Sequence, residues 1–213
     1  MDLFVDDKKV DAECVGDGTL AELLRDVWAT RCPPPRILVG FRCDGVEVAG
    51  AAMATTLTRP AGSFELLEVF TSTREDLVAD AMAQASASLE ETEGVTQDVA
   101  ELLMEGKAVE GIERLGQCLR IWQQIHDAVV KSLELLRLNP ARVMVRDELL
   151  ATAMDKPKDV LLQIKGALQA QDHVLLADIL QFEFAEVTDM WHTMIARLRQ
   201  EADDLRSAPG GAN

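Results

Sequence analysis

The spacing of apolar residues changes near residue 72, and the two parts of the chain favour different secondary structure. Before this point, short runs of β-forming residues lie between Gly, Pro and Asp residues. After it, apolar residues recur every three or four positions almost to the C-terminus, which places them on one face of a helix. The sequence therefore predicts an α+β protein with an N-terminal domain over residues 1–71, a helical domain over residues 72–206 and a flexible tail over residues 207–213.

Five short segments of the N-terminal domain have the composition of strands: residues 3–5, 10–15, 37–43, 46–49 and 64–70. Asp6-Asp7-Lys8 and Asp44-Gly45 are turn residues, and each predicts a hairpin between the strands that flank it.

One helix is expected in this domain. It begins at Thr19, because Glu22 three positions later completes a capping box, and it ends before Pro33-Pro34-Pro35. Residues 50–62 are small and polar, with Pro60 and Gly62, and they predict a loop or an irregular crossing.

The order of these elements, namely hairpin, helix, hairpin and late strand, resembles the ubiquitin-like β-grasp fold, in which a mixed sheet wraps one helix. The resemblance covers residues 1–71. Ubiquitin-like modifiers and sulfur carriers end in Gly-Gly directly after the last strand, whereas here that strand leads through Thr71-Ser72-Thr73 into a helix. The resemblance therefore implies a binding module, without conjugation or sulfur-transfer chemistry.

Four helical segments are expected in the second domain. The first begins at Ser72 with Glu75 completing a capping box, and breaks at Glu105-Gly106. The second ends at Asn139-Pro140, the third covers residues 141–169 and the fourth covers residues 172–206. Segments of about 30 residues, or about 45 Å if helical, with short connections predict an antiparallel, up-down four-helix-type bundle. Three long coiled-coil arms are the alternative, and Asp155-Lys156-Pro157 leaves open whether the third segment is one helix or two.

The charge of the chain limits its partners. With 37 acidic and 21 basic side chains, the net charge is −16, and this field repels phosphate groups, so neither nucleic acid nor an anionic membrane is expected as a partner. No apolar stretch is long enough to cross a bilayer, and the first ten residues do not have the pattern of a signal peptide. We therefore expect a cytoplasmic protein.

The strongest polar signal is a cluster of eight acidic residues opposed within its span by Lys107 alone: Glu90, Glu91, Glu93, Asp98, Glu101, Glu105, Glu110 and Glu113. They surround the turn between the first two helices. One interpretation is a solvated face, and the other is a docking surface for a basic helix or tail. Trp122 and Trp191 lie on the apolar stripes of their helices, where they either pack in the core or anchor a partner.

Motifs of catalysis and cofactor binding are absent from the sequence. There is no GxSxG, no phosphate-binding glycine loop and no GxGxxG. The Glu-x-x-His pairs of di-iron bundles are missing, and Cys14, Cys32, Cys43 and Cys118 have no CxxC spacing. We expect reduced thiols, no metal, no cofactor and no enzymatic activity.

These features favour a non-enzymatic adaptor or scaffold that binds a protein partner with a basic or amphipathic helix, or that forms a homo-oligomer. The alternative is a small acidic chaperone. In its overall architecture, the acidic antiparallel bundle resembles the export chaperones of flagellar and type III secretion systems, which hold an amphipathic helix of a client in an apolar groove. Those chaperones usually lack a β-grasp domain.

Overall fold

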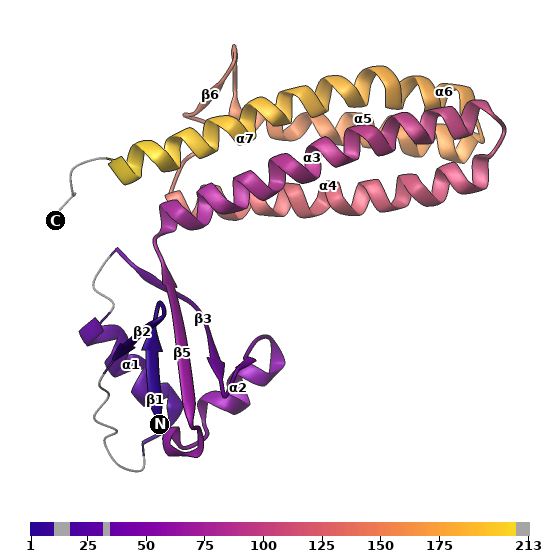
Figure 1. The fold of residues 1–213 in the computed structure, drawn as a ribbon. Coiled ribbons are helices and arrows are strands. Elements are labelled where there is room, and N and C mark those ends of the chain that lie inside the picture. Colours follow the sequence, from indigo (N-terminus) through magenta and orange to yellow (C-terminus); the bar gives the residue numbers. More distant parts are fainter. Residues whose placement is uncertain (11–17, 32–34, 208–213) are drawn as a thin grey trace. The chain divides into compact units, whose positions relative to one another are not determined.

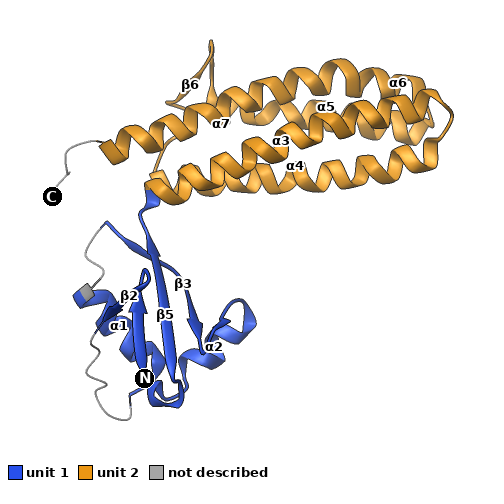
Figure 2. Cartoon of the chain, in the orientation of Figure 1, with its two compact units in different colours: residues 1–74 blue, residues 75–213 orange. Residues whose placement is uncertain are grey.

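The computed structural model describes residues 1–10, 18–31 and 35–207. The chain divides into two compact units, Met1–Arg74 and Glu75–Asn213 (Figure 2). We call them the sheet unit and the helical unit. The chain is an α+β protein in which a mixed sheet comes first and the long helices follow.

The sheet unit contains a five-stranded sheet with the order β2-β1-β5-β3-β4 (Figure 1). Its strands are β1 (Asp2–Val5), β2 (Lys8–Val10), β3 (Ile37–Cys43), β4 (Val46–Glu47) and β5 (Leu66–Ser72). The first and last strands, β1 and β5, pair in parallel at the centre, and the other neighbours pair antiparallel. The sheet is therefore mixed, and this architecture is compatible with the predicted β-grasp.

Both predicted hairpin turns are confirmed. Asp6 and Asp7 have φ angles of 49° and 62°, and Asp44 and Gly45 have φ angles of 51° and 76°. Two consecutive residues with positive φ give a turn whose twist matches that of the strands it joins. The second predicted strand continued to residue 15, but residues 11–15 lie outside the described residues.

Helix α1 (Leu20–Arg31) begins at the predicted capping box. The backbone N–H of Thr19 donates to Glu22 Oε2 at 2.8 Å, and the N–H of Glu22 donates to Thr19 Oγ1 at 3.3 Å. The apolar face of α1 packs on the sheet and forms the core of this unit with buried strand residues: Leu3, Val5, Leu20, Leu24, Val27, Phe41, Cys43, Leu67 and Val69.

Two predictions for residues 50–72 are wrong. The expected loop contains helix α2 (Ala51–Leu57) and a 3-10 turn, η1 (Ala61–Ser63), because three of the seven α2 residues are alanines, which have the highest helix propensity. The last strand lies two residues later than predicted, since β5 includes Ser72. Ser72 is therefore a strand residue rather than a helix cap, and the next helix begins at Arg74.

The helical unit consists of long helices around one apolar core. Figure 1 shows α3, α4, α5 and α7 lying side by side. Its elements are α3 (Arg74–Met104), α4 (Ala108–Leu136), the short strands β6 (Met144–Val145) and β7 (Glu148–Leu149), α5 (Leu150–Ala170), α6 (His173–Asp178), a π-helical turn η2 (Ile179–Glu183) and α7 (Phe184–Ser207). The predicted break between the first two helices is confirmed at Gly106, whose φ is 79°.

The third predicted segment is a short hairpin followed by a single helix. Residues 144–149 form the β6–β7 hairpin, and α5 continues through Asp155-Lys156-Pro157 without a break. A proline inside a helix removes one backbone hydrogen bond. Here its ring is buried on the same face as Ala153, Val160 and Ile164, and this packing keeps the helix continuous.

Helical spacing predicted the buried faces well, with errors at their margins. On α3, the residues that recur every three or four positions are buried along the helix: Val78, Met82, Ala85, Leu89, Thr92, Thr96, Val99 and Leu103. In α4, Ile112 is exposed, and the buried face includes Gly111, Cys118 and Ile125. Leu205, at the end of the α7 stripe, is also exposed.

Candidate functional site

Trp122 and Trp191 lie together in the core of the helical unit. Their ring centroids are 5.0 Å apart at an interplanar angle of 64°, and Phe184 packs edge-on against Trp122 at 5.1 Å. Trp191 is fully buried and Trp122 nearly so. Neither indole N–H has a hydrogen-bond acceptor among the described residues. Core packing is therefore the role that the structure gives both residues, and a role in anchoring a partner stays a prediction.

All eight residues of the predicted acidic cluster are exposed. Four of them form ion pairs: Glu93 with His192, Asp98 and Glu110 with Arg114, and Glu105 with Lys107. The other four form no ion pair with any described residue: Glu90, Glu91, Glu101 and Glu113.

The fold divides this cluster between two sides of α3. On one side, Arg114 of α4 contacts both Asp98 (3.2 Å) and Glu110 (3.4 Å), and neutralises part of the charge there. On the other side, Glu93 and Glu101 are separated by eight residues and share a helical face with Gln97 between them. These three side chains line a groove. The cluster therefore includes two separate groups of carboxylates, of which Glu93 and Glu101 line the groove.

The groove lies between α3 on one side and η2 with the start of α7 on the other, and has a volume of about 440 Å³. Nine residues line it: Glu93, Thr96, Gln97 and Glu101 from α3, and Leu180, Gln181, Phe182, Ala185 and Thr188 from the other side. Its charged lining residues are both carboxylates. We call this surface the α3–η2 groove.

Phe182 is the functional candidate that the sequence interpretation missed. It lies in the π-helical turn, and 65% of it is exposed, whereas Leu180 and Phe184 on either side of it in sequence are buried. Single π-helical turns within α-helices are frequent at functional sites. A signal was present in the sequence, because Phe182 falls off the apolar stripe of its helix.

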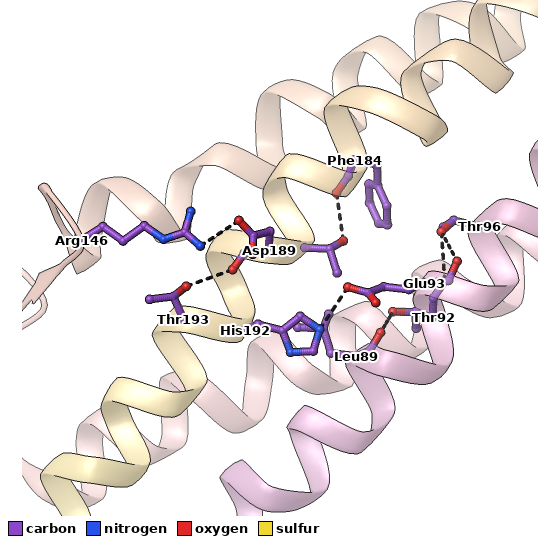
Figure 3. A network of polar contacts seen from close by, with 10 residues as sticks. Leu89, Thr92, Glu93, Thr96, Arg146, Phe184, Asp189, His192 and Thr193 are labelled. Carbon is purple, nitrogen blue, oxygen red and sulfur yellow. Dashed lines mark hydrogen bonds and ion pairs between the residues drawn. The ribbon is translucent and has the colours of Figure 1, made fainter.

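Polar contacts hold the helices together beside the groove (Figure 3). Glu93 of α3 lies 3.1 Å from His192 Nε2 of α7, and Arg146 of the β6–β7 hairpin lies 2.7 Å from Asp189 of α7. At the last residue of η2, Gln163 of α5 donates to Glu183. Side chains of α3, α5 and the β6–β7 hairpin thus contact the chain just C-terminal to Phe182.

The hydroxyl groups in this region are satisfied by their own helices. Thr92 donates to the carbonyl of Leu89 at 2.7 Å, and Thr188 donates to the carbonyl of Phe184 at 2.9 Å (Figure 3). Thr96 donates to carbonyls of its own helix, at 2.9 and 3.1 Å. The buried Thr96 and Thr188 therefore present their surfaces to the groove without needing a hydrogen bond from a ligand.

Several apolar side chains near the helix connections are also exposed. Met104 and Val109 flank the turn between α3 and α4, and Val174 and Leu175 lie at the start of α6. In Figure 1 both connections lie at the same end of the helical unit. This end therefore combines exposed apolar side chains with the acidic residues of the α3–α4 turn.

The two cysteines among the described residues, Cys43 and Cys118, are buried. Burial raises the pKa of Cys118 to about 11, and burial is also the main cause that raises the pKa of Cys43, so both thiols are protonated and weakly nucleophilic at neutral pH. Among residues 1–10, 18–31 and 35–207, no group of three or more His, Cys, Asp or Glu side chains is arranged to hold a metal ion. None of the described helices is long and apolar enough to span a membrane.

The chain matches a known protein family. The sequence model of a family described as Domain of unknown function (DUF8042) matches residues 80–194, which is more than half of the chain. The matched range contains all ten residues predicted as a binding site and the whole lining of the α3–η2 groove. No curated protein and no solved structure matches the chain.

Proposed function

The chain belongs to the DUF8042 family, and we propose that it is a non-enzymatic adaptor or scaffold whose helical unit binds a basic protein partner. The observation that carries this proposal is the combination of unneutralised carboxylates, exposed apolar side chains and a groove in one region of the helical unit. Acidic residues alone keep a protein soluble, but an apolar surface beside them is typical of a binding site.

The distribution of charge supports a basic partner. The helical unit has 25 acidic and 13 basic residues, whereas the sheet unit has 12 acidic and 8 basic residues. Most of the net charge of −16 therefore lies on the unit that carries the groove. Such a field accelerates association with basic surfaces and repels nucleic acids.

We propose a binding role for the sheet unit as well, as a β-grasp-like module. The strand order β2-β1-β5-β3-β4, the central parallel pair and the single long helix on one face support it. The proposed framework of the helical unit is an antiparallel four-helix-type bundle of α3, α4, α5 and α6–α7. One continuous core, contributed by all of these segments, supports it.

A chaperone for an amphipathic client is the second candidate. The exposed apolar residues near the α3–α4 turn favour it, because a holding chaperone needs an apolar surface that its client covers. Both candidates predict binding of a helix with basic and apolar residues. They differ in the fate of the complex, since a client is released for export whereas a scaffold partner stays bound.

The binding of a defined basic helix tests the proposed function. The probe is a fluorescent amphipathic helical peptide of leucine and lysine, and the peptide control replaces every lysine with glutamate. The charge-reversal double variant Glu101→Lys/Glu105→Lys is expected to bind the leucine–lysine peptide at least tenfold more weakly than the full natural chain does, measured by fluorescence anisotropy.

The matched control is Asp80→Lys/Asp159→Lys, which changes the net charge equally at exposed sites. Asp80 lies 21 residues, or about 32 Å, from Glu101 along α3. Equal weakening by both double variants would show that only the total charge matters, and the proposed binding surface would be rejected. Equal binding of the two peptides would reject a basic partner.

A further inference from the structure

We propose that the α3–η2 groove is the docking site for one amphipathic helix of the basic partner, with an apolar side chain of that helix packed against Phe182 and its Lys or Arg side chains beside Glu93 and Glu101. This inference rests on the proposed function and assigns its binding site. In this inference Phe182 is the apolar anchor, and the carboxylates of Glu93 and Glu101 form the charged rim of the groove.

The groove fits side chains rather than a whole polypeptide segment. Its volume of about 440 Å³ is at the lower end of the range for binding pockets, about 300 to 1,000 Å³. Glu93 and Glu101 are eight residues apart, or about 12 Å along α3. Basic residues about two helical turns apart on a partner helix would have a similar separation.

The floor of the groove favours an apolar group. The hydroxyl groups of Thr96 and Thr188 are already bonded to carbonyls of their own helices. An apolar side chain can therefore cover them without leaving a buried polar group unsatisfied. Leu180 adds a buried apolar surface, and Phe182 adds an exposed aromatic ring of the kind that forms interaction hot spots.

The charge of the groove lining determines which charge the ligand must carry. Glu93 and Glu101 are the charged residues of the groove lining, and no Lys or Arg lines it among the described residues. An anionic ligand such as a phosphate or carboxylate would therefore be repelled. A helix with Lys or Arg residues along one edge of its apolar stripe complements both the carboxylates of α3 and the floor.

The backbone of the groove favours a helical partner over an extended one. Addition of a strand requires a sheet edge with unpaired backbone groups. Both sides of the groove are helical, with α3 on one side and η2 and α7 on the other, so their backbone groups bond within each helix. Recognition is then left to side chains, which is the mode by which grooves bind amphipathic helices.

Two groove variants and one matched control test this assignment with the leucine–lysine peptide and the full-length chain. Phe182→Ala removes the anchor, and Ala185→Gln places a larger side chain in the groove. Each is expected to weaken binding at least tenfold. Leu162→Ala removes an apolar side chain that is also 65% exposed, on α5 outside the groove lining, and it is expected to change binding less than twofold.

The outcomes separate this inference from the proposed function. If Glu101→Lys/Glu105→Lys weakens binding while Phe182→Ala and Ala185→Gln bind normally, the proposed binding of a basic partner is supported and the groove assignment is wrong. If none of these variants weakens binding, both proposals are wrong. A peptide of the same composition with prolines that prevent helix formation should bind at least tenfold more weakly, and equal binding would overturn the helical partner.

Discussion

His192 Nε2 lies 3.1 Å from Glu93 Oε1, and this contact joins α7 to α3 at the edge of the α3–η2 groove. Both side chains remain partly exposed, so the pair contributes at most about 1 kcal/mol to stability. Glu93→Gln should therefore leave the free energy of unfolding within about 1 kcal/mol of its original value. The same variant should weaken binding of the leucine–lysine peptide. Chemical denaturation and anisotropy measure the two effects, and a loss of more than about 2 kcal/mol would show that the contact is structural.

Asp6 provides a pH-dependent contact in the sheet unit. Its carboxylate accepts from the backbone N–H of Thr71 at 2.7 Å, the Thr71 hydroxyl at 2.6 Å and the Arg36 guanidinium at 2.7 Å. Partial burial acts to raise the pKa of Asp6, but the Thr71 hydrogen bonds and Arg36 outweigh it, so the pKa lies below its ordinary value of 3.8. A lowered pKa stabilises the fold fully above that ordinary value, and the contribution is lost as the pH falls through the folded pKa.

Asp6→Asn should therefore destabilise the sheet unit at neutral pH by about 1 to 2 kcal/mol. It should also make the free energy of unfolding depend less on pH below about pH 4. Hydrogen exchange at the amides of β1 and β5, compared with those of α3, identifies which unit responds. Asp7→Asn is the matched control, because Asp7 lies in the same turn and is exposed. An equal effect of both variants would contradict the role given to Asp6.

Gly94 and Gly106 should respond in opposite directions to alanine. Gly94 lies within α3, and a Cβ added there would meet no atom within 4 Å. Gly94→Ala should stabilise the helical unit by about 0.5 to 1 kcal/mol, because glycine loses more backbone entropy in a helix. Gly106 has a φ of 79°, so Gly106→Ala should cost about 1 kcal/mol or more. Thermal unfolding should show the two shifts, and a destabilised Gly94→Ala would contradict the exposed position.

Trp191 should be among the most sensitive core positions. It is fully buried, so Trp191→Ala is expected to cost about 3 to 5 kcal/mol. Trp191→Phe should cost less, because it also removes an indole N–H that lacks an acceptor among the described residues. Phe182→Ala, at an exposed position, should change stability by less than about 0.5 kcal/mol. Urea denaturation ranks the three variants, and a similar loss in all of them would contradict this placement.

Cys118 should resist alkylation in the folded protein. It is fully buried and its pKa is raised to about 11, so the reactive thiolate is scarce and inaccessible. Iodoacetamide at mildly alkaline pH should label the Cys118 peptide only after denaturant is added, as measured by mass spectrometry. Rapid labelling of the native protein would show that the core of the helical unit opens on the timescale of the reaction.

Elements with a local cause could be predicted from the sequence. The Thr19–Glu22 capping box, the Asp44-Gly45 turn and the break at Gly106 each depend on residues within a few positions of one another. For the same reason the buried stripe of α3 could be read from its spacing. The eight residues of the acidic cluster are exposed, because a charged side chain opposite an apolar stripe faces water.

Elements that depend on distant parts of the chain could not be predicted in this way. Pro157 breaks a helix by its local chemistry, yet it lies inside α5, where its ring is buried in the core. The π-helical turn that exposes Phe182 forms where α6 continues into α7. The spacing of the apolar stripe leaves Phe182 off the buried face, but it does not predict the π-helical geometry.

The sequence by itself determined the long helices, the faces that they bury and the strong acidity of the helical part, because these properties depend on near neighbours and on composition. Tertiary structure decided that β1 pairs with β5, that Glu93 and Glu101 face η2 while Asp98 faces Arg114, and that a groove lies beside Phe182. Contacts between residues far apart in the sequence decide which helix packs beside α3. The spacing of residues within one helix carries no information about these contacts.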